Sequence, residues 1–184
     1  MAWPPHLHIA VNVSARQLAD RAVVKTVAST LAEVGLDPRR LVLEVTESAV
    51  MDDADRALTH LAQLRDLGLS IAIDDFGTGY SSLSYLKRMP VDVLKIDRSF
   101  VDGLGRDEGD LAIVSSVVAL ARAFKLRVVA EGVETEEQHA MLAALGCDYG
   151  QGYLWSRPAP ADQFQLLTDW SLAVTDNVVN PGGP

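Results

Sequence analysis

Short apolar runs alternate with longer amphipathic segments along almost the whole chain. Each run has the length of a buried β-strand, and a helix-length segment separates it from the next in most cases. The runs are His8–Val13, Leu41–Val45, Leu69–Ile73, Val91–Ile96, Leu126–Ala130 and Tyr149–Trp155. Strands and helices in alternation, joined by short connections, predict an α/β fold with parallel strands and right-handed crossovers.

Capping residues mark the predicted helices in the first half of the chain. The segment Ser14–Gln17 has the Ser-x-x-Gln pattern of a capping box, and it opens a helix predicted to run as far as Gly35. A second helix is predicted to begin after Asp52 or Asp53 and to end at Gly68.

The second half carries similar signals. Thr135–Gln138 is another capping box whose helix ends at Gly146, and Asp107–Phe124 has apolar residues at helical spacing. A short helix is predicted around Ser82–Arg88. With no interior linker, residues 1–175 are expected to form one domain. The Pro- and Gly-rich tail Asp176–Pro184 is expected to be disordered.

Composition narrows the class of protein. The 184 residues include one cysteine, Cys147, which excludes a disulfide scaffold and a cysteine-based zinc site. No apolar stretch is long enough to cross a membrane, and Met1–His8 lacks the pattern of a signal peptide, so a cytoplasmic location is expected. The net charge of −9, without a basic cluster along the sequence, argues against binding duplex nucleic acid. A small anionic ligand remains compatible if metal ions supply positive charge.

Polar residues interrupt or follow the apolar runs near their carboxyl ends, where parallel α/β folds build their sites. They are Asn12, Glu44, Asp74, Asp75, Lys95, Glu131 and Gln151. Carboxylates together with the amide oxygen of Asn12 suit hard cations such as Mg²⁺ or Mn²⁺. Lys95, the lysine among these acids, is either a structural ion-pair partner or a group that holds a water for attack.

A simpler interpretation applies to any one of these acids. A single acidic residue after a strand is ordinarily a helix N-cap, and we interpret Asp52 and Asp53 in that way. Polar groups at six successive strand ends favour a functional site instead. Asp74 and Asp75 are also followed by a glycine-rich loop, Phe76–Ser82, that can approach a ligand closely. The residues alone therefore predict a metal-dependent hydrolase with an unassigned substrate.

Six motifs extend this interpretation: Asn12–Ser14, Leu43–Glu47, Asp74–Ser82, Leu94–Val101, Ala130–Thr135 and Gln151–Tyr153. In this order they resemble the EAL-domain family of bacterial cyclic-di-GMP phosphodiesterases. The resemblance covers about Leu7 to Pro160. It implies a modified TIM barrel that opens cyclic di-GMP to linear pGpG.

The resemblance also implies a two-metal centre containing Mg²⁺ or Mn²⁺. Asn12, Glu44 and Asp74 match ligands of one ion, and Asp74 also reaches the second. Asp75 matches a ligand of that second ion, near Glu131. Paired cations neutralise an anionic dinucleotide and lower the pKa of a bound water.

Further positions match supporting roles in the family. Lys95 matches the residue that holds or deprotonates the attacking water, Glu134 a supporting carboxylate, and Gln151 a residue that positions water or substrate. Glu47 matches the residue that anchors the loop after Asp75, which in the family couples dimer packing to the active site. The substrate-side positions of this loop are Phe76, Gly77, Thr78 and Gly79.

One family feature is missing from this sequence. It contains no Glu-Ala-Leu segment, whose glutamate ligates a metal in the family, and only 11 residues precede Asn12. The resemblance therefore implies an incomplete barrel with about six of eight strands, and hydrolysis by this polypeptide alone is expected to be weak or absent.

Three explanations stay open. Met1 is an internal residue of a longer protein with an upstream sensor or GGDEF-type domain, or a partner chain completes the fragment, or the chain is a non-catalytic cyclic-di-GMP receptor or protein-interaction domain. Because the incomplete sheet leaves exposed edges, and because the family forms dimers, a homodimer is expected.

Overall fold

The computed structural model describes residues 7–51, 53–78 and 83–160, and its centre is a six-stranded parallel sheet. The strands are β1 (Ile9–Asn12), β2 (Leu41–Thr46), β3 (Ser70–Phe76), β4 (Val93–Ile96), β5 (Arg127–Glu131) and β6 (Tyr149–Gln151). The helical elements are α1 (Ala15–Ala19), α2 (Val23–Val34), η1 (Pro38–Arg40), α3 (Glu47–Met51), α4 (Ala54–Asp66), α5 (Leu83–Leu86), α6 (Arg98–Asp102), α7 (Glu108–Phe124) and α8 (Glu136–Leu145).

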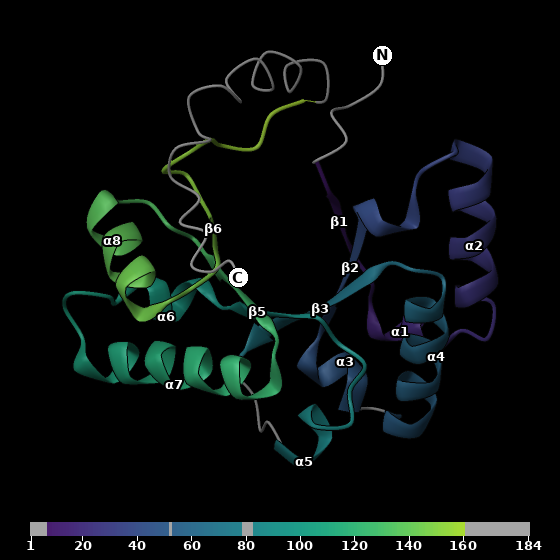
Figure 1. Ribbon diagram of the computed structural model, residues 1–184, viewed down its shortest axis with the longest axis horizontal. Helices are drawn as coiled ribbons and strands as arrows, with labels where there is room; N and C mark the ends of the chain where they lie inside the picture. The colour runs from purple at the N-terminus through teal and green to yellow at the C-terminus, as the bar shows by residue number, and fades with distance from the viewer. Residues whose placement is uncertain (1–6, 52, 79–82, 161–184) are drawn as a thin grey trace, which may run out of the picture.

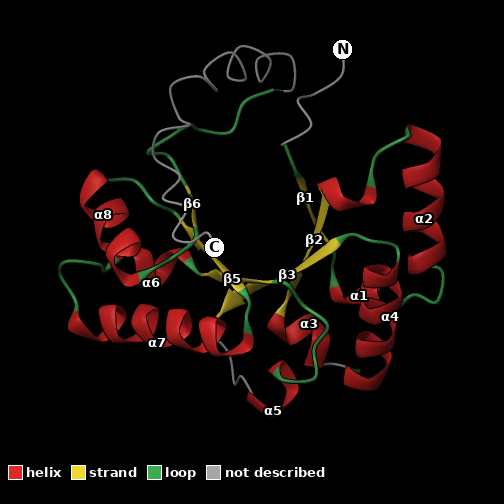
Figure 2. Cartoon of the chain, in the orientation of Figure 1, coloured by secondary structure: helices red, strands yellow, loops and turns green. Residues whose placement is uncertain are grey.

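The strands lie in the sheet in the order in which they occur along the chain. When successive crossovers are all right-handed and the strand order never reverses, every helix falls on the same face of the sheet. Figure 1 shows this arrangement, with the helices outside and the sheet curling so that β1 and β6 lie at its two ends. The secondary-structure view in Figure 2 shows the strands enclosed by helices on the sides and below. The expected incomplete TIM-like barrel is confirmed.

The core lies between the outer face of the sheet and the helices. Successive residues of a strand point to opposite faces, so Leu94 and Ile96 of β4 face one side and Lys95 faces the other. Leu94 and Ile96 are completely buried, as is Leu61 of α4. The outermost strands differ, since Val11 of β1 is 43% exposed and Tyr149 of β6 is 50% exposed.

Most predicted helix boundaries are confirmed. Both capping boxes form, at Ser14 and at Thr135, and Gly35 and Gly146 end their helices in the left-handed conformation. Asp107 caps α7. Asp52 and the disordered tail expected at 176–184 lie outside the described residues.

Two predicted elements are wrong in extent. The helix expected from Ser14 to Gly35 is two helices, because α1 ends at Ala19 and a turn follows in which the Asp20 carboxylate accepts a hydrogen bond from the amide of Ala22. The last strand ends at Gln151 instead of Trp155. In the part of the chain that the structure describes, no helix is long and apolar enough to cross a membrane.

Candidate active site at the carboxyl ends of the strands

Three carboxylates from three strands converge on the ammonium group of Lys95 in β4. The distance from Lys95 Nζ is 2.8 Å to Glu44 Oε2 of β2, 3.2 Å to Asp74 Oδ1 of β3 and 2.5 Å to Glu131 Oε1 of β5. The lysine side chain is only 5% exposed, and the three acids are 11–21% exposed. A buried charge must be paired, and here one cation is shared by three anions. The polar cluster predicted at the strand ends is therefore present.

A bulge in β3 accounts for the two consecutive aspartates at this site. Ile73 and Phe76 pair with β4 residues that are only two positions apart, so β3 carries one extra residue. The bulge contains Asp75, which has a φ of 54°. This left-handed conformation is costly for a residue other than glycine. A bulge bends a strand and re-aims its side chains. In a regular strand, Asp74 and Asp75 would point to opposite faces of the sheet.

The electrostatics of the cluster follow from burial and from these contacts. Burial alone would lower the pKa of Lys95, but hydrogen bonds to Glu131 and Glu44 outweigh it and raise that pKa well above its usual range. Burial raises the pKa of Glu131, with smaller contributions from Asp74 and Glu44, and Lys95 opposes this rise. Lys95 is therefore a protonated hydrogen-bond donor in this arrangement.

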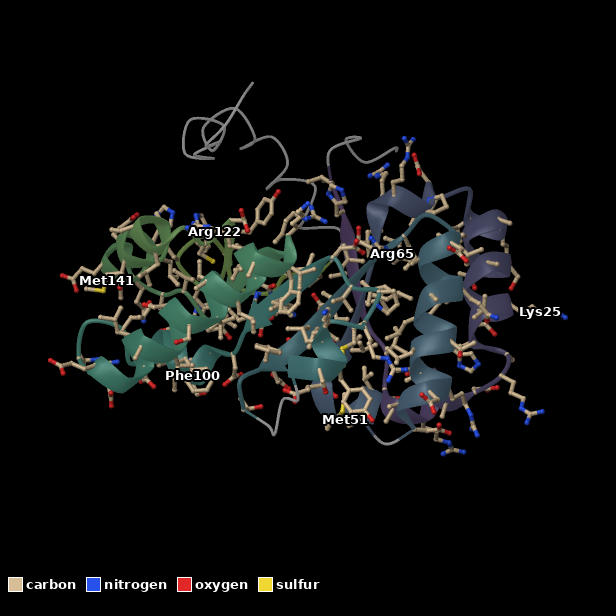
Figure 3. The ribbon with its side chains drawn as sticks, turned by 60° about the horizontal axis from the view of Figure 1, so that its bottom comes forward. Lys25, Met51, Arg65, Phe100, Arg122 and Met141 are labelled. Atoms are coloured by element: carbon tan, nitrogen blue, oxygen red, sulfur yellow. The ribbon has the colours of Figure 1, made fainter. Side chains whose placement is uncertain are left out.

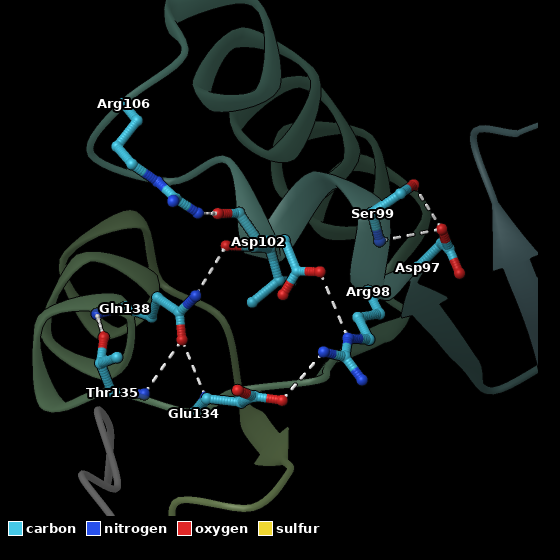
Figure 4. A network of polar contacts seen from close by, with 9 residues as sticks. Asp97, Arg98, Ser99, Asp102, Arg106, Glu134, Thr135 and Gln138 are labelled. Carbon is cyan, nitrogen blue, oxygen red and sulfur yellow. Dashed lines mark hydrogen bonds and ion pairs between the residues drawn. The ribbon is translucent and has the colours of Figure 1, made fainter.

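Asp97 belongs to the same region, although it is not among the residues predicted from the sequence. It caps α6 by accepting a hydrogen bond from the amide of Ser99 at 3.0 Å, as Figure 4 shows. Burial raises the pKa of the Asp75 carboxyl, and Asp74 and Asp97 raise it further. The pKa of Asp97 is lowered because its hydrogen bonds to Ser99 outweigh burial. The available signal was its position two residues after Lys95, at the end of the same strand.

Strand register places the two outer candidates beside cluster residues. Asn12 is aligned with Glu44 across β1 and β2, and Gln151 is aligned with Glu131 across β5 and β6. Aligned residues of parallel strands project to the same face of the sheet. Both Asn12 and Gln151 are exposed, which leaves their amide groups open to solvent.

Glu134 lies on the loop after β5, in the polar network of Figure 4. Its carboxylate accepts a hydrogen bond from the Arg98 guanidinium at 2.9 Å, and its amide donates to Gln138 Oε1 at 2.8 Å. The side-chain nitrogen of Gln138, Nε2, then donates a hydrogen bond to the backbone carbonyl of Val101 at 3.2 Å. Glu134 thereby connects this loop to both α6 and α8.

Glycine is required at one position of this loop. Gly132 has a φ of 71°, and a Cβ atom there would lie 2.3 Å from Cγ of Arg98. The methylene chain of Arg98 thus occupies the space that any larger residue would need. This close approach lets Arg98 reach Glu134.

The remaining candidate residues lie at or just after the ends of β2 and β3. Glu47 is the first residue of α3 and is only 7% exposed. Phe76 is buried at the end of β3, and the hydroxyl of Thr78 donates at 2.8 Å to a carbonyl three residues earlier. Gly77 follows Phe76 with a φ of 100°. Gly79 lies outside the described residues.

The donor set is chemically suited to a hard divalent cation. The site offers carboxylate oxygens of Glu44, Asp74 and Glu131, the ligand type that Mg²⁺ and Mn²⁺ prefer. Among residues 7–51, 53–78 and 83–160, however, no three acidic, His or Cys side chains form a ready metal-binding group. The acids contact Lys95 instead, so a bound cation would share them with its ammonium group.

Comparisons with known proteins place this fold and site in context. The model of the EAL domain matches residues 1–158. Over 156 residues the chain is 54% identical to the bifunctional diguanylate cyclase/cyclic di-GMP phosphodiesterase MucR of Pseudomonas aeruginosa, covering 85% of this chain and 23% of MucR. The chain thus spans about a quarter of that relative.

Solved structures agree. The PaMucR phosphodiesterase in its c-di-GMP complex superposes with a TM-score of 0.82 at 54% identity, covering 85% of this chain and 64% of that one. The Klebsiella pneumoniae BlrP1 manganese/cy-diGMP complex gives a TM-score of 0.77 at 38% identity, covering 83% and 39%. With a family match over most of its length, this chain belongs to the EAL domain family.

Proposed function

We propose that this chain carries most of the active site of a metal-dependent phosphodiesterase that hydrolyses cyclic di-GMP to linear pGpG. The observation that carries the proposal is the convergence of Glu44, Asp74 and Glu131 on Lys95, in a chain of the EAL family. Relatives named as cyclic di-GMP phosphodiesterases, and a structural neighbour named as a c-di-GMP complex, support the choice of substrate.

Two divalent cations, Mg²⁺ or Mn²⁺, complete the proposed site. Asn12, Glu44 and Asp74 would hold one ion, and Asp74 and Asp75 the second, close to Glu131. Bound cations would polarise the phosphoryl oxygen and offset the negative charge of the dinucleotide. The manganese complex of BlrP1 supports this choice of metal.

The residues of the chain have separate tasks in this proposal. Lys95 would keep its proton on Nζ, and when a cation takes over one of its carboxylate partners the freed N–H would donate a hydrogen bond to the attacking water. Glu131, which lies 2.5 Å from Lys95 Nζ and whose pKa is raised by burial, would accept the proton of that water. The water oxygen would bond to phosphorus as one P–O ester bond breaks, and the released sugar oxygen would take up a proton from solvent. Gln151 positions water or substrate at the rim.

Arg98 and Glu47 hold the surrounding loops. The Arg98 guanidinium fixes Glu134 at 2.9 Å, so Glu134 supports the site from the loop after β5. Glu47 anchors the loop that begins at Asp75. We further propose that the active protein is a cytoplasmic homodimer, and that the chain belongs to a longer protein with an upstream sensor or GGDEF-type domain. Curated relatives several times its length support the last point.

The test is incubation of the chain with cyclic di-GMP and Mn²⁺, followed by chromatography for pGpG. An Asp75→Ala preparation is the blank for contaminating hydrolases. Turnover above this blank is the expected result once the chain is extended by an upstream segment that supplies the missing glutamate. A folded, extended chain that produces no pGpG would contradict the proposal.

A non-catalytic cyclic-di-GMP receptor is the second candidate. The observation in its favour is that Lys95 already neutralises the carboxylates, so the acids are satisfied without a metal. A receptor of this kind would bind cyclic di-GMP equally well in EDTA and in Mg²⁺. The phosphodiesterase should bind it more tightly in Mg²⁺ than in EDTA.

A further inference from the structure

An open cavity lies at the opposite end of the sheet from the candidate active site. Its volume is about 530 Å³, it lies where the chain enters β4 and β5, and helices α4, α5 and α7 end beside it. Cavities of this volume fall within the range of small-molecule sites. β4 has four residues, so about 13 Å of strand separates the two ends.

Four cations surround this cavity in a chain of net charge −9: Arg65, Lys87, Lys125 and Arg127. They come from three segments of the chain, and only Lys125 and Arg127 are near neighbours in the sequence. The one acidic lining residue is Asp92, whose carboxylate already accepts from the amide of Ile71 at 3.0 Å and contacts Arg65 at 3.2 Å.

Three of the cations have no anionic partner among the described residues. Lys87, Lys125 and Arg127 are exposed, and within the described part of the chain none of them forms an ion pair. A helix C-terminus stabilises nearby cations, which accounts for Arg65 and Lys125 at the ends of α4 and α7. It does not account for Arg127, which begins a strand.

The backbone at Lys125 gives an independent reason to look for a ligand. This residue ends α7 with a φ of 59°, in the conformation that Gly35 and Gly146 adopt at the ends of α2 and α8. Apart from glycines, only Asp75 and Lys125 have a positive φ among the described residues. Asp75 lies in the candidate active site. Glycine would adopt this φ without strain, so the presence of lysine here indicates that its side chain has a function.

The lining also includes apolar side chains, among them Leu86, Met89, Phe124 and Leu126. Leu86 is nearly fully buried and the other three are partly buried. Cations next to apolar side chains match a ligand with a compact anionic group and an apolar body. We propose that this cavity binds a small phosphorylated compound of that kind, of the size of a nucleoside triphosphate. The proposal does not depend on hydrolysis at the other end of the sheet.

The test is calorimetric titration of the chain with ATP in EDTA, which removes any binding through divalent cations at the carboxyl ends of the strands. Lys87→Glu and Lys125→Gly should each weaken ATP binding about tenfold, because a hydrogen bond to a charged group contributes on that order. Lys125→Gly also relieves the positive φ, so this variant should unfold at the same temperature as the wild type or higher.

Lys25→Glu is the matched control for Lys87→Glu. It makes the same change in net charge on α2, where Figure 3 shows Lys25 projecting away from the molecule, and it should leave ATP binding unchanged. Inorganic triphosphate should bind more weakly than ATP, because it has no apolar part to contact the apolar side chains of the lining.

Four results would overturn the proposal: no binding of ATP, an equal loss in Lys25→Glu, loss of binding in Asp75→Ala, or triphosphate binding as tight as ATP. Binding of a polyglutamate peptide by the same cations, without binding of ATP, would also reject the small-molecule ligand. Circular dichroism of each variant confirms that it is folded before its affinity is compared.

Discussion

Replacing Lys95 with methionine removes the charge at the centre of the carboxylate cluster while nearly preserving side-chain volume. In the wild type, Nζ lies within 3.2 Å of oxygens from Glu44, Asp74 and Glu131, all of them mostly buried. In Lys95→Met these acids would face one another without a cation. Removing one partner of a buried ion pair costs about 3–5 kcal/mol.

A second estimate limits this cost. An acid that cannot ionise in the folded state must fold protonated, and at pH 7 this costs about 1.4 kcal/mol for each pH unit above its usual pKa of about 4. The limit is therefore about 4 kcal/mol for each acid. Since domains of this kind are stable by about 5–15 kcal/mol, the loss is large and measurable.

Urea unfolding in EDTA at several pH values measures this loss. In Lys95→Met the folded-state pKa values of the acids rise above their unfolded values. The stability they contribute is therefore fully present below about pH 4 and is lost as pH rises through the folded-state values. The difference from wild type should be small at pH 4 and reach about 3–5 kcal/mol at pH 7. Added Mn²⁺ should restore more stability to Lys95→Met than to wild type, because no ammonium competes for the carboxylates.

Two results would refute this reasoning. One is a Lys95→Met chain as stable as wild type in EDTA at pH 7. The other is a difference between the two chains that does not change with pH. The control is Lys95→Met combined with Glu131→Gln, which removes one of the freed charges and should be more stable than Lys95→Met alone at pH 7.

Three further predictions concern backbone and capping. Asp75→Gly should keep or raise the unfolding temperature, because glycine accepts a φ of 54° without strain, yet it should abolish metal-dependent turnover; a clear loss of stability would contradict the strain described at the bulge. Gly132→Ala should destabilise the chain by more than Gly35→Ala, since both have positive φ but only the former would bring a Cβ within 2.3 Å of Arg98, and denaturant midpoints compare the two. Asp107→Ala should cost about 1 kcal/mol in urea unfolding, because it removes the hydrogen bond from the amide of Gly109 at the start of α7; an unchanged midpoint would argue against the cap.

The sequence predicts local structure well where the signal is contained in a few residues. The capping boxes at Ser14 and Thr135 each place donor and acceptor three residues apart, and both form. The break at Asp20 was missed because its hydrogen bond to Ala22 competes with an apolar pattern that continues across the turn. Periodicity alone cannot choose between the two.

The site required information from far along the chain. The sequence indicates that Glu44, Asp74, Lys95 and Glu131 end neighbouring strands, but the strand register decides that three acids meet one ammonium group. The bulge that turns Asp75 is likewise a property of how β3 pairs with β4. Asp97 was missed because an acid after a strand is ordinarily a cap, and here it is a cap that also raises the pKa of Asp75.

The strand order has a consequence for how the chain folds as it is synthesised. In the described sheet each strand pairs with strands adjacent to it along the chain, and paired residues are 20 to 34 positions apart. Each new strand–helix unit leaving the ribosome therefore finds its docking edge already formed. Growth can proceed from one edge in the direction of translation, without waiting for distant segments. The carboxylate cluster around Lys95 is completed late in synthesis, because Glu131 on β5 joins it only after β2, β3 and β4 are in place.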